Sequence, residues 1–304
     1  VSTCLFCMES IQIKKYTLEG QVAFLAKKDS LHILSSSKEL LEISLKKEEN
    51  IANSADFQKA MKAASKKKPT VFINHKEFPH LLKSHFSEEV FSSLRTFSNW
   101  TALDIDLDRA SIKLNGISTA GDTLPALLNV FKGVGLSQNT LASLAPANSA
   151  AFVSVTFQDA PKLLSNLGKF RGENAPKISS ENALFDTAVE AGTIQLEEGA
   201  VFVLRTLDIE AARLSLDFEP KATETFREID IFEYPYHDRF QKMLQPLVST
   251  KNLQYFAFLE PYILFSETPE ALKEVINAYR SEQVLGKSKA YAATSESLSS
   301  EASL

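Results

Sequence analysis

Two segments near opposite ends of the chain repeat the same order of apolar and polar residues. The first contains Val22–Leu25, Ile33–Ser36 and Lys38–Ile43, and the second contains Phe256–Leu259, Ile263–Ser266 and Pro269–Ile276. Each segment predicts two short apolar strands, a serine-containing stop and an amphipathic helix. A supersecondary unit that occurs twice in one chain indicates a fold built from repeats.

The similarity extends beyond these two segments. The pattern from Ile11 to Ala64 recurs from Ile229 to about Leu298. In the first copy, paired helices lead into a strand of β-branched and aromatic residues at Thr70–Asn74. In the second copy, the helices end at Ser299–Leu304, where the matching strand would begin. We therefore expect the natural protein to continue past Leu304 and this chain to be an excerpt.

Strict alternation of apolar and polar residues predicts an antiparallel hairpin from Trp100–Leu107 and Ile112–Ile117. Short hairpin connections argue against a parallel doubly wound sheet. The predicted fold is α+β, with mostly antiparallel sheets and paired helices on one face, built from repeated strand-strand-helix-helix-strand units. We expect one half at 1–147 and a second at 148–304, which either form separate domains or share one sheet.

Other elements follow from apolar runs that turn residues separate. Ser36 or Ser37 is the expected cap of the first helix, and Ser54 is the expected cap of the second. Strands are predicted at Ala151–Phe157 and Ala200–Thr206, and helices at Ala183–Ala191, at Phe240–Leu247 and through Leu163, Leu164 and Leu167.

The composition excludes several classes of protein. A net charge of −5 argues against a nucleic-acid-binding protein, which normally has a basic surface. No apolar run reaches the roughly 18 residues that span a bilayer. Cys4 and Cys7 are the only cysteines, and neither a second ligand pair for zinc nor a βαβ pattern accompanies them. We expect them to have no role and to lie in a poorly ordered terminus.

Acidic and imidazole side chains form no metal-site pattern. Asp104, Asp106 and Asp108 alternate as in a calcium loop, but that loop needs Gly where Arg109 stands and Glu where Asn115 stands. We expect a strand with an acidic outer face and with Leu103, Ile105 and Leu107 on its inner face. The five histidines are His32, His75, His80, His85 and His237, and their spacing fits no zinc motif. We predict no metal site and no cofactor.

Catalytic motifs are also missing from the sequence. It contains no nucleophile elbow and no glycine-rich phosphate loop, and it has only ten glycines. The densest group of mixed polar side chains is Tyr234–Arg239, which we interpret as a turn before the helix at Phe240. An alternative interpretation is that Tyr234–His237 forms a binding surface.

A short motif resembles one family. The run Leu144–Ser149 (LAPANS), followed by the apolar Ala151–Val153, resembles a turn in a group of uncharacterised exported bacterial proteins of the flavobacterial type. The segments Asn99–Asp106, Leu114–Gly116 and Asn129–Pro146 are similar to that group as well. The resemblance implies an envelope-associated protein, with a lipid anchor upstream or at the N-terminus. It implies no catalytic residue.

These observations favour a non-enzymatic module of the cell envelope that binds a protein partner or acts as a scaffold. The alternative is a small-molecule or glycan-binding domain, with a cleft between the halves near Tyr234–His237 or Asp104–Asp108. A hydrolase is the third hypothesis. A flat exposed apolar patch would favour the first hypothesis, and a deep apolar pocket with converging polar groups would favour the second.

Overall fold

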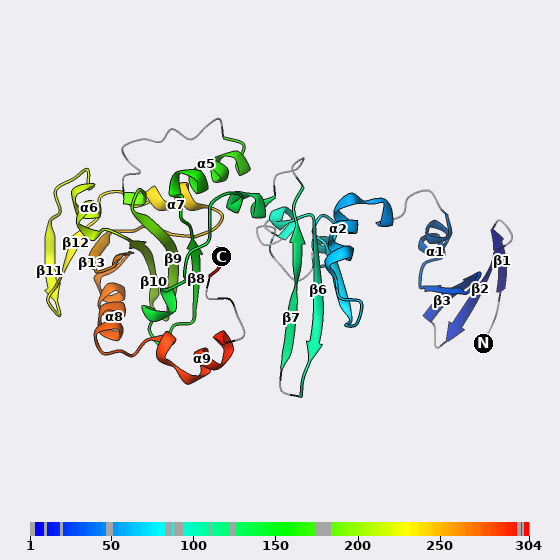
Figure 1. The fold of residues 1–304 in the computed structure, drawn as a ribbon. Helices are drawn as coiled ribbons and strands as arrows, with labels where there is room; N and C mark the ends of the chain where they lie inside the picture. The colour runs from blue at the N-terminus through cyan, green and yellow to red at the C-terminus, as the bar shows by residue number, and fades with distance from the viewer. Residues whose placement is uncertain are drawn as a thin grey trace. The chain divides into compact units, whose positions relative to one another are not determined.

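The computed structural model describes residues 4–8, 11–18, 21–46, 51–82, 87, 94–109, 111–121, 126–173, 184–296, 299 and 301–303 (Figure 1). The chain divides into two compact units. Unit 1 contains Val1–Ile73 and Trp100–Thr119, and unit 2 contains Asn74–Asn99 and Ala120–Leu304. The halves 1–147 and 148–304 expected from the repeat are a different division, and they stay a prediction.

The first sheet of unit 1 is four-stranded and antiparallel. Its strands follow the chain in the order β1 (Cys4–Met8), β2 (Ile11–Leu18), β3 (Gln21–Lys28) and β4 (Leu31–Ser35). The backbone of Cys4–Met8 pairs with β2 along its whole length, and the expectation of a poorly ordered terminus stays a prediction.

Helix α1 (Lys38–Leu45) packs on this sheet. Its buried Leu41 and Leu45 meet Ile13 and Ala26 of the strands. The hydroxyl of Ser37 accepts a hydrogen bond from the N–H of Leu40, so one of the two expected caps is confirmed.

A second sheet in unit 1 has three strands, in the order β5 (Thr70–Asn74), β6 (Trp100–Leu107) and β7 (Ile112–Thr119). Helix α2 (Ala55–Ala63), capped by Ser54 as expected, covers one face of it. The small core between helix and sheet contains Phe57, Ala60, Phe72, Trp100 and Ala102. The predicted hairpin of β6 and β7 is confirmed.

The expected orientation of β6 is wrong. Trp100 and Ala102 face α2, so Asp104 shares the covered face, and Leu103, Ile105 and Leu107 lie on the opposite one. The inversion arises because Asp104 is fixed on the covered side, where its carboxylate accepts hydrogen bonds from the N–H of Ser65. Alternation alone reveals two faces but not which face a helix covers.

Unit 2 contains a seven-stranded sheet in which every neighbouring pair is antiparallel. Its order is β11 (Ala222–Phe226), β12 (Ile229–Glu233), β13 (Tyr255–Leu259), β14 (Tyr262–Ser266), β10 (Gly199–Thr206), β9 (Ala188–Leu196) and β8 (Ala151–Thr156). The predicted strands at Ala151–Phe157 and Ala200–Thr206 are therefore confirmed.

Helices pack on both faces of this sheet, whereas the sequence predicts them on one. One core contains buried residues of α5 (Ala160–Phe170), α6 (Ile209–Leu214) and α7 (Arg239–Leu244). The other contains those of α8 (Pro269–Arg280) (Figure 1). The central strands require this cover, because their side chains are buried on both faces, as the fully buried Val201 and Leu204 of β10 illustrate.

The helix predicted at Ala183–Ala191 is wrong at its C-terminal end. Residues 188–191 begin β9, which lies between β8 and β10. Alanine favours helices in isolation, but a central strand that pairs on both edges and is buried on both faces overrides that weak preference.

The remaining elements are short. They are α3 (Phe78–Leu82), α9 (Lys289–Ser295) and the 3-10 helices η1 (Ile51–Asn53), η2 (Leu127–Phe131), η3 (Leu141–Ser143) and η5 (Leu285–Lys287). Among the described residues, no helix has the length and apolar character needed to cross a bilayer. The structure confirms a mixed fold of helices and several antiparallel sheets, and the internal repeat stays a prediction.

Candidate functional site

An apolar face is exposed on the three-stranded sheet of unit 1. We define the apolar face as Val71, Leu103, Ile105, Leu107, Ile112 and Leu114. Leu107 lies opposite Ile112, and Ile105 lies opposite Leu114. Val71 joins them because its neighbour Phe72 points toward α2.

The side chains of this face are open to solvent. Leu107 is 69% exposed, Ile112 72%, Leu114 54% and Val71 45%. Single exposed apolar residues are normal on a protein surface, but a contiguous group on a regular sheet face is typical of an interaction site. The sequence contained the signal, in the alternation of β6, but the wrong face was assigned to the interior.

The acidic residues of β6 make structural contacts on the opposite side. Asp104 also accepts a hydrogen bond from the hydroxyl of Thr70, at 2.5 Å. Asp106 pairs with Lys68 at 2.8 Å, and this hydrogen bond lowers the pKa of Asp106 below its usual range. Within the described ranges, no three His, Cys, Asp or Glu side chains gather to hold a metal ion.

The histidines of the chain differ in burial. His75 is buried, and its Nδ1 lies 3.0 Å from the carbonyl oxygen of Leu94. Burial lowers the pKa of His75, and the hydrogen bond with Leu94 opposes this by a smaller amount. His32, His80 and His237 are exposed, and His85 lies outside the described residues.

Tyr234–Arg239 is a packed cluster in unit 2. Tyr234 is 1% exposed and stacks on Phe240 with 5.7 Å between ring centroids. Arg239 lies over the ring of Tyr236 at 3.7 Å and pairs with Asp217 at 2.9 Å. Burial raises the pKa of Tyr234, and the charge of Arg239 opposes the rise. These contacts favour a structural role for Tyr236 and Arg239, whereas Pro235 and His237 are exposed and line a hollow of about 500 Å³ together with Tyr234. The part played by Asp217 was not apparent from the sequence.

A cleft of about 660 Å³ opens on unit 2 beside β8. We define the β8 cleft by a floor of Ala151, Val153, Thr193, Gln195, Ala200 and Phe202 and a wall formed by Pro246–Leu253. The strand register explains the floor, since Thr193 lies opposite both Val153 and Phe202, and Gln195 lies opposite both Ala151 and Ala200. Sequence reasoning missed this cleft, because it depends on pairing between distant strands.

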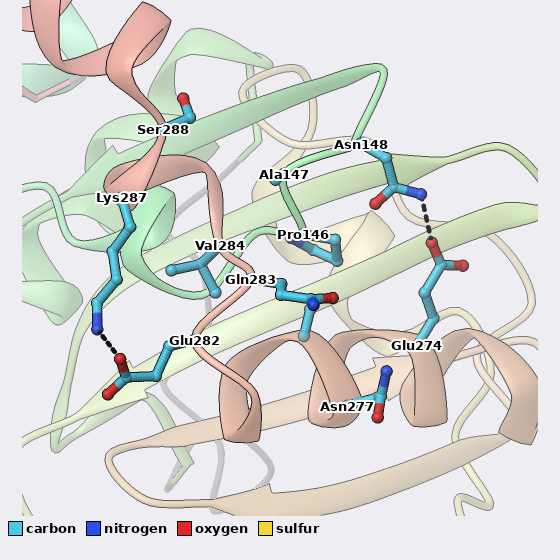
Figure 2. A pocket seen from close by; sticks show the side chains of 11 residues that line it. Pro146, Ala147, Asn148, Glu274, Asn277, Glu282, Gln283, Val284, Lys287 and Ser288 are labelled. Atoms are coloured by element: carbon cyan, nitrogen blue, oxygen red, sulfur yellow. Dashed lines mark hydrogen bonds and ion pairs between the residues drawn. The ribbon is translucent and has the colours of Figure 1, made fainter.

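A second hollow, of about 540 Å³, lies at the end of α8 (Figure 2). The LAPANS turn forms one side of it. Asn148 donates to Glu274 at 3.2 Å, and Glu282 pairs with Lys287 at 2.6 Å (Figure 2). The N–H of Ala147 also donates to the carbonyl oxygen of Gln283. The turn that carries the family resemblance is thus hydrogen-bonded to α8 and to the residues that follow this helix.

Comparisons with family models, with curated proteins and with solved structures find no match for this chain.

Proposed function

We propose that the chain is a non-enzymatic module of the bacterial cell envelope that binds a protein partner on the apolar face. The observation that carries the proposal is the exposure of Leu107 and Ile112, side by side on a regular hairpin. The opposite face of the same sheet packs against α2, and the two form the core. The exposed leucines and isoleucines are therefore not needed to hold the sheet together.

The energetics favour a partner for this face. Moving one fully exposed Leu, Ile or Val side chain out of water is favourable by roughly 1.5–3 kcal/mol, before the entropic cost of association is subtracted. Leu107, Ile112 and Leu114 are neighbours on the paired strands β6 and β7. Val71 lies on β5, at the other edge of β6. A partner with a flat apolar surface, such as another sheet face or an amphipathic helix, matches this geometry.

The test compares two double variants in the native host. Leu107→Lys with Ile112→Lys places two charges on the apolar face. Leu207→Lys with Leu214→Lys is the matched control, because these leucines of unit 2 are 75% and 86% exposed. Quantitative co-isolation with one defined partner is expected to fall at least tenfold for the first variant only. An equal loss for both variants, or no loss for either, contradicts the proposal.

The location in the envelope is part of the proposal. Its support is the resemblance at Leu144–Ser149 to exported bacterial proteins, which also suggests a lipid anchor upstream or at the N-terminus. Fractionation of native cells tests it. Recovery in the membrane or periplasmic fraction is expected, and recovery in the cytoplasm contradicts it.

We also propose that two segments are copies of one unit. The support is local: β3, β4 and α1 follow one another as β13, β14 and α8 do, and Ser37 and Thr268 cap the two helices in the same way. A single helix then packs on one face of each hairpin. Separate expression of the two segments would test whether each forms the same hairpin and helix.

A further inference from the structure

We propose that the β8 cleft binds an amphipathic carboxylate, an acyl chain that ends in a carboxylate group. This site lies in unit 2 and is independent of the apolar face of unit 1. Three observations carry the proposal: an apolar floor, a wall held in place, and polar groups suited to a ligand oxygen.

The floor of the β8 cleft is continuous with the hydrophobic core at one end and is exposed to solvent at Val153. Val155, Ala191 and Leu204 form the next cross-strand row, and all three are fully buried. One row further along, Phe202 is 1% exposed but Val153 is 46% exposed. The helices that cover this face therefore leave the beginning of β8 open. An alkyl chain placed there would remove Val153 from water and extend the core.

The wall is held in position without a ligand. The hydroxyl of Thr193 donates to the carbonyl oxygen of Ser249 at 3.2 Å, which joins the floor to the wall. Arg171 donates to the carbonyl oxygen of Gln245 at 2.9 Å. Within the wall, Leu247, Val248 and Leu253 are themselves buried. A preformed cleft loses little conformational entropy on binding, which favours affinity.

Two neighbouring side chains of the wall suit an anionic oxygen. Thr250 lines the cleft and is 4% exposed, and within the described part of the chain its hydroxyl has no hydrogen-bond partner. A buried hydroxyl without a partner is destabilising. Because its oxygen is shielded from solvent, a ligand oxygen reaches it only when the side chain of Thr250 rotates toward the cleft.

Lys251 is the next residue and is exposed. Among the described residues, no carboxylate pairs with its ammonium group. The other charged residue of the lining, Glu267, is engaged by Asn252 at 3.0 Å. Glu267 keeps its negative charge, so the lining carries one charge of each sign, and a ligand carboxylate is attracted locally by the ammonium group of Lys251.

The test uses the full chain and the fluorescent fatty acid cis-parinaric acid as the probe. Laurate and dodecanol, below their micelle concentrations, then compete for the site. We expect saturable binding of the probe and displacement by laurate at a concentration at least fivefold lower than by dodecanol. Lys251→Gln is expected to remove this preference and to leave the displacement by dodecanol unchanged.

Three further variants place the site. Val153→Arg puts a charge on the floor at an exposed position and is expected to abolish probe binding. Leu214→Arg, at an exposed leucine that is not part of the lining, is expected to change nothing. Thr250→Val is expected to raise the melting temperature, because it removes the unpaired hydroxyl, and to weaken laurate binding.

The possible outcomes distinguish a failure of the site from a failure of the carboxylate preference. No saturable binding, or equal binding by the Val153→Arg variant, overturns the site. Equal displacement by laurate and dodecanol, with no effect of Lys251→Gln, overturns the carboxylate and leaves an apolar cleft. Neither result bears on the protein-binding function of unit 1, which the apolar-face variants test.

Discussion

The carboxylate of Glu190 lies 3.2 Å from Nε of Arg205, with side chains only 2% and 17% exposed. The two residues face each other on β9 and β10. Glu190 also accepts hydrogen bonds from the N–H groups of Thr140 and Leu141 and from the hydroxyl of Ser154. One buried carboxylate thus joins three strands to the start of η3.

Glu190→Gln tests the structural importance of this network. The amide keeps the shape but leaves the guanidinium of Arg205 without its countercharge, and breaking one side of a buried pair costs about 3 kcal/mol. We expect a lower melting temperature for unit 2 in scanning calorimetry. Glu198→Gln, on the exposed turn between the same strands, is the control and should leave the melting temperature unchanged. Equal melting temperatures for both variants would contradict the assignment.

Asp104→Asn addresses the acidic strand. The carboxylate holds Ser65 and Thr70 against β6, so the variant should lower the free energy of unfolding by about 1–2 kcal/mol. The control is Asp106→Asn, whose ion pair with Lys68 is exposed and should contribute less to stability than the contacts of Asp104. Urea titration followed by the fluorescence of Trp100, the single tryptophan, measures both. A larger loss for Asp106→Asn would show that the strand is oriented the other way.

His75 gives a prediction for pH. Because burial lowers its pKa in the folded state below the ordinary 6.5, protons bind more tightly to the unfolded chain. The stabilising contribution is therefore complete above pH 6.5 and is lost as the pH falls below that value.

We expect His75→Asn, which retains a donor near the carbonyl of Leu94, to flatten this decline in urea titrations between pH 7.5 and 5. The exposed His32→Gln should retain the decline. The same slope in all three proteins would rule out His75 as its source.

Much of the local structure could be predicted from the sequence. The hairpin of β6 and β7, the caps at Ser37 and Ser54 and the strand at β10 are confirmed, because period and turn chemistry are encoded over a few residues. The start of β9 was wrongly predicted as helix. Its burial depends on two partner strands that are distant in sequence, so a local pattern could not reveal it.

The binding surfaces were harder to predict for the same reason. Alternation identified the two faces of β6, but the face that α2 covers depends on contacts between residues distant in sequence, such as Phe57 with Trp100 and Ser65 with Asp104. The floor of the β8 cleft requires Val153, Thr193 and Phe202 to align across three strands. No local pattern records such a register.

The most direct measurement places a photo-crosslinking amino acid at Leu107 or at Asp106 in cells of the native host. These neighbours on β6 point to opposite faces, and both side chains are exposed. We expect a discrete protein adduct from position 107, matched at Ile112, and little from position 106. Adducts of equal yield at both positions, or none at either, would contradict a protein-binding role for the apolar face.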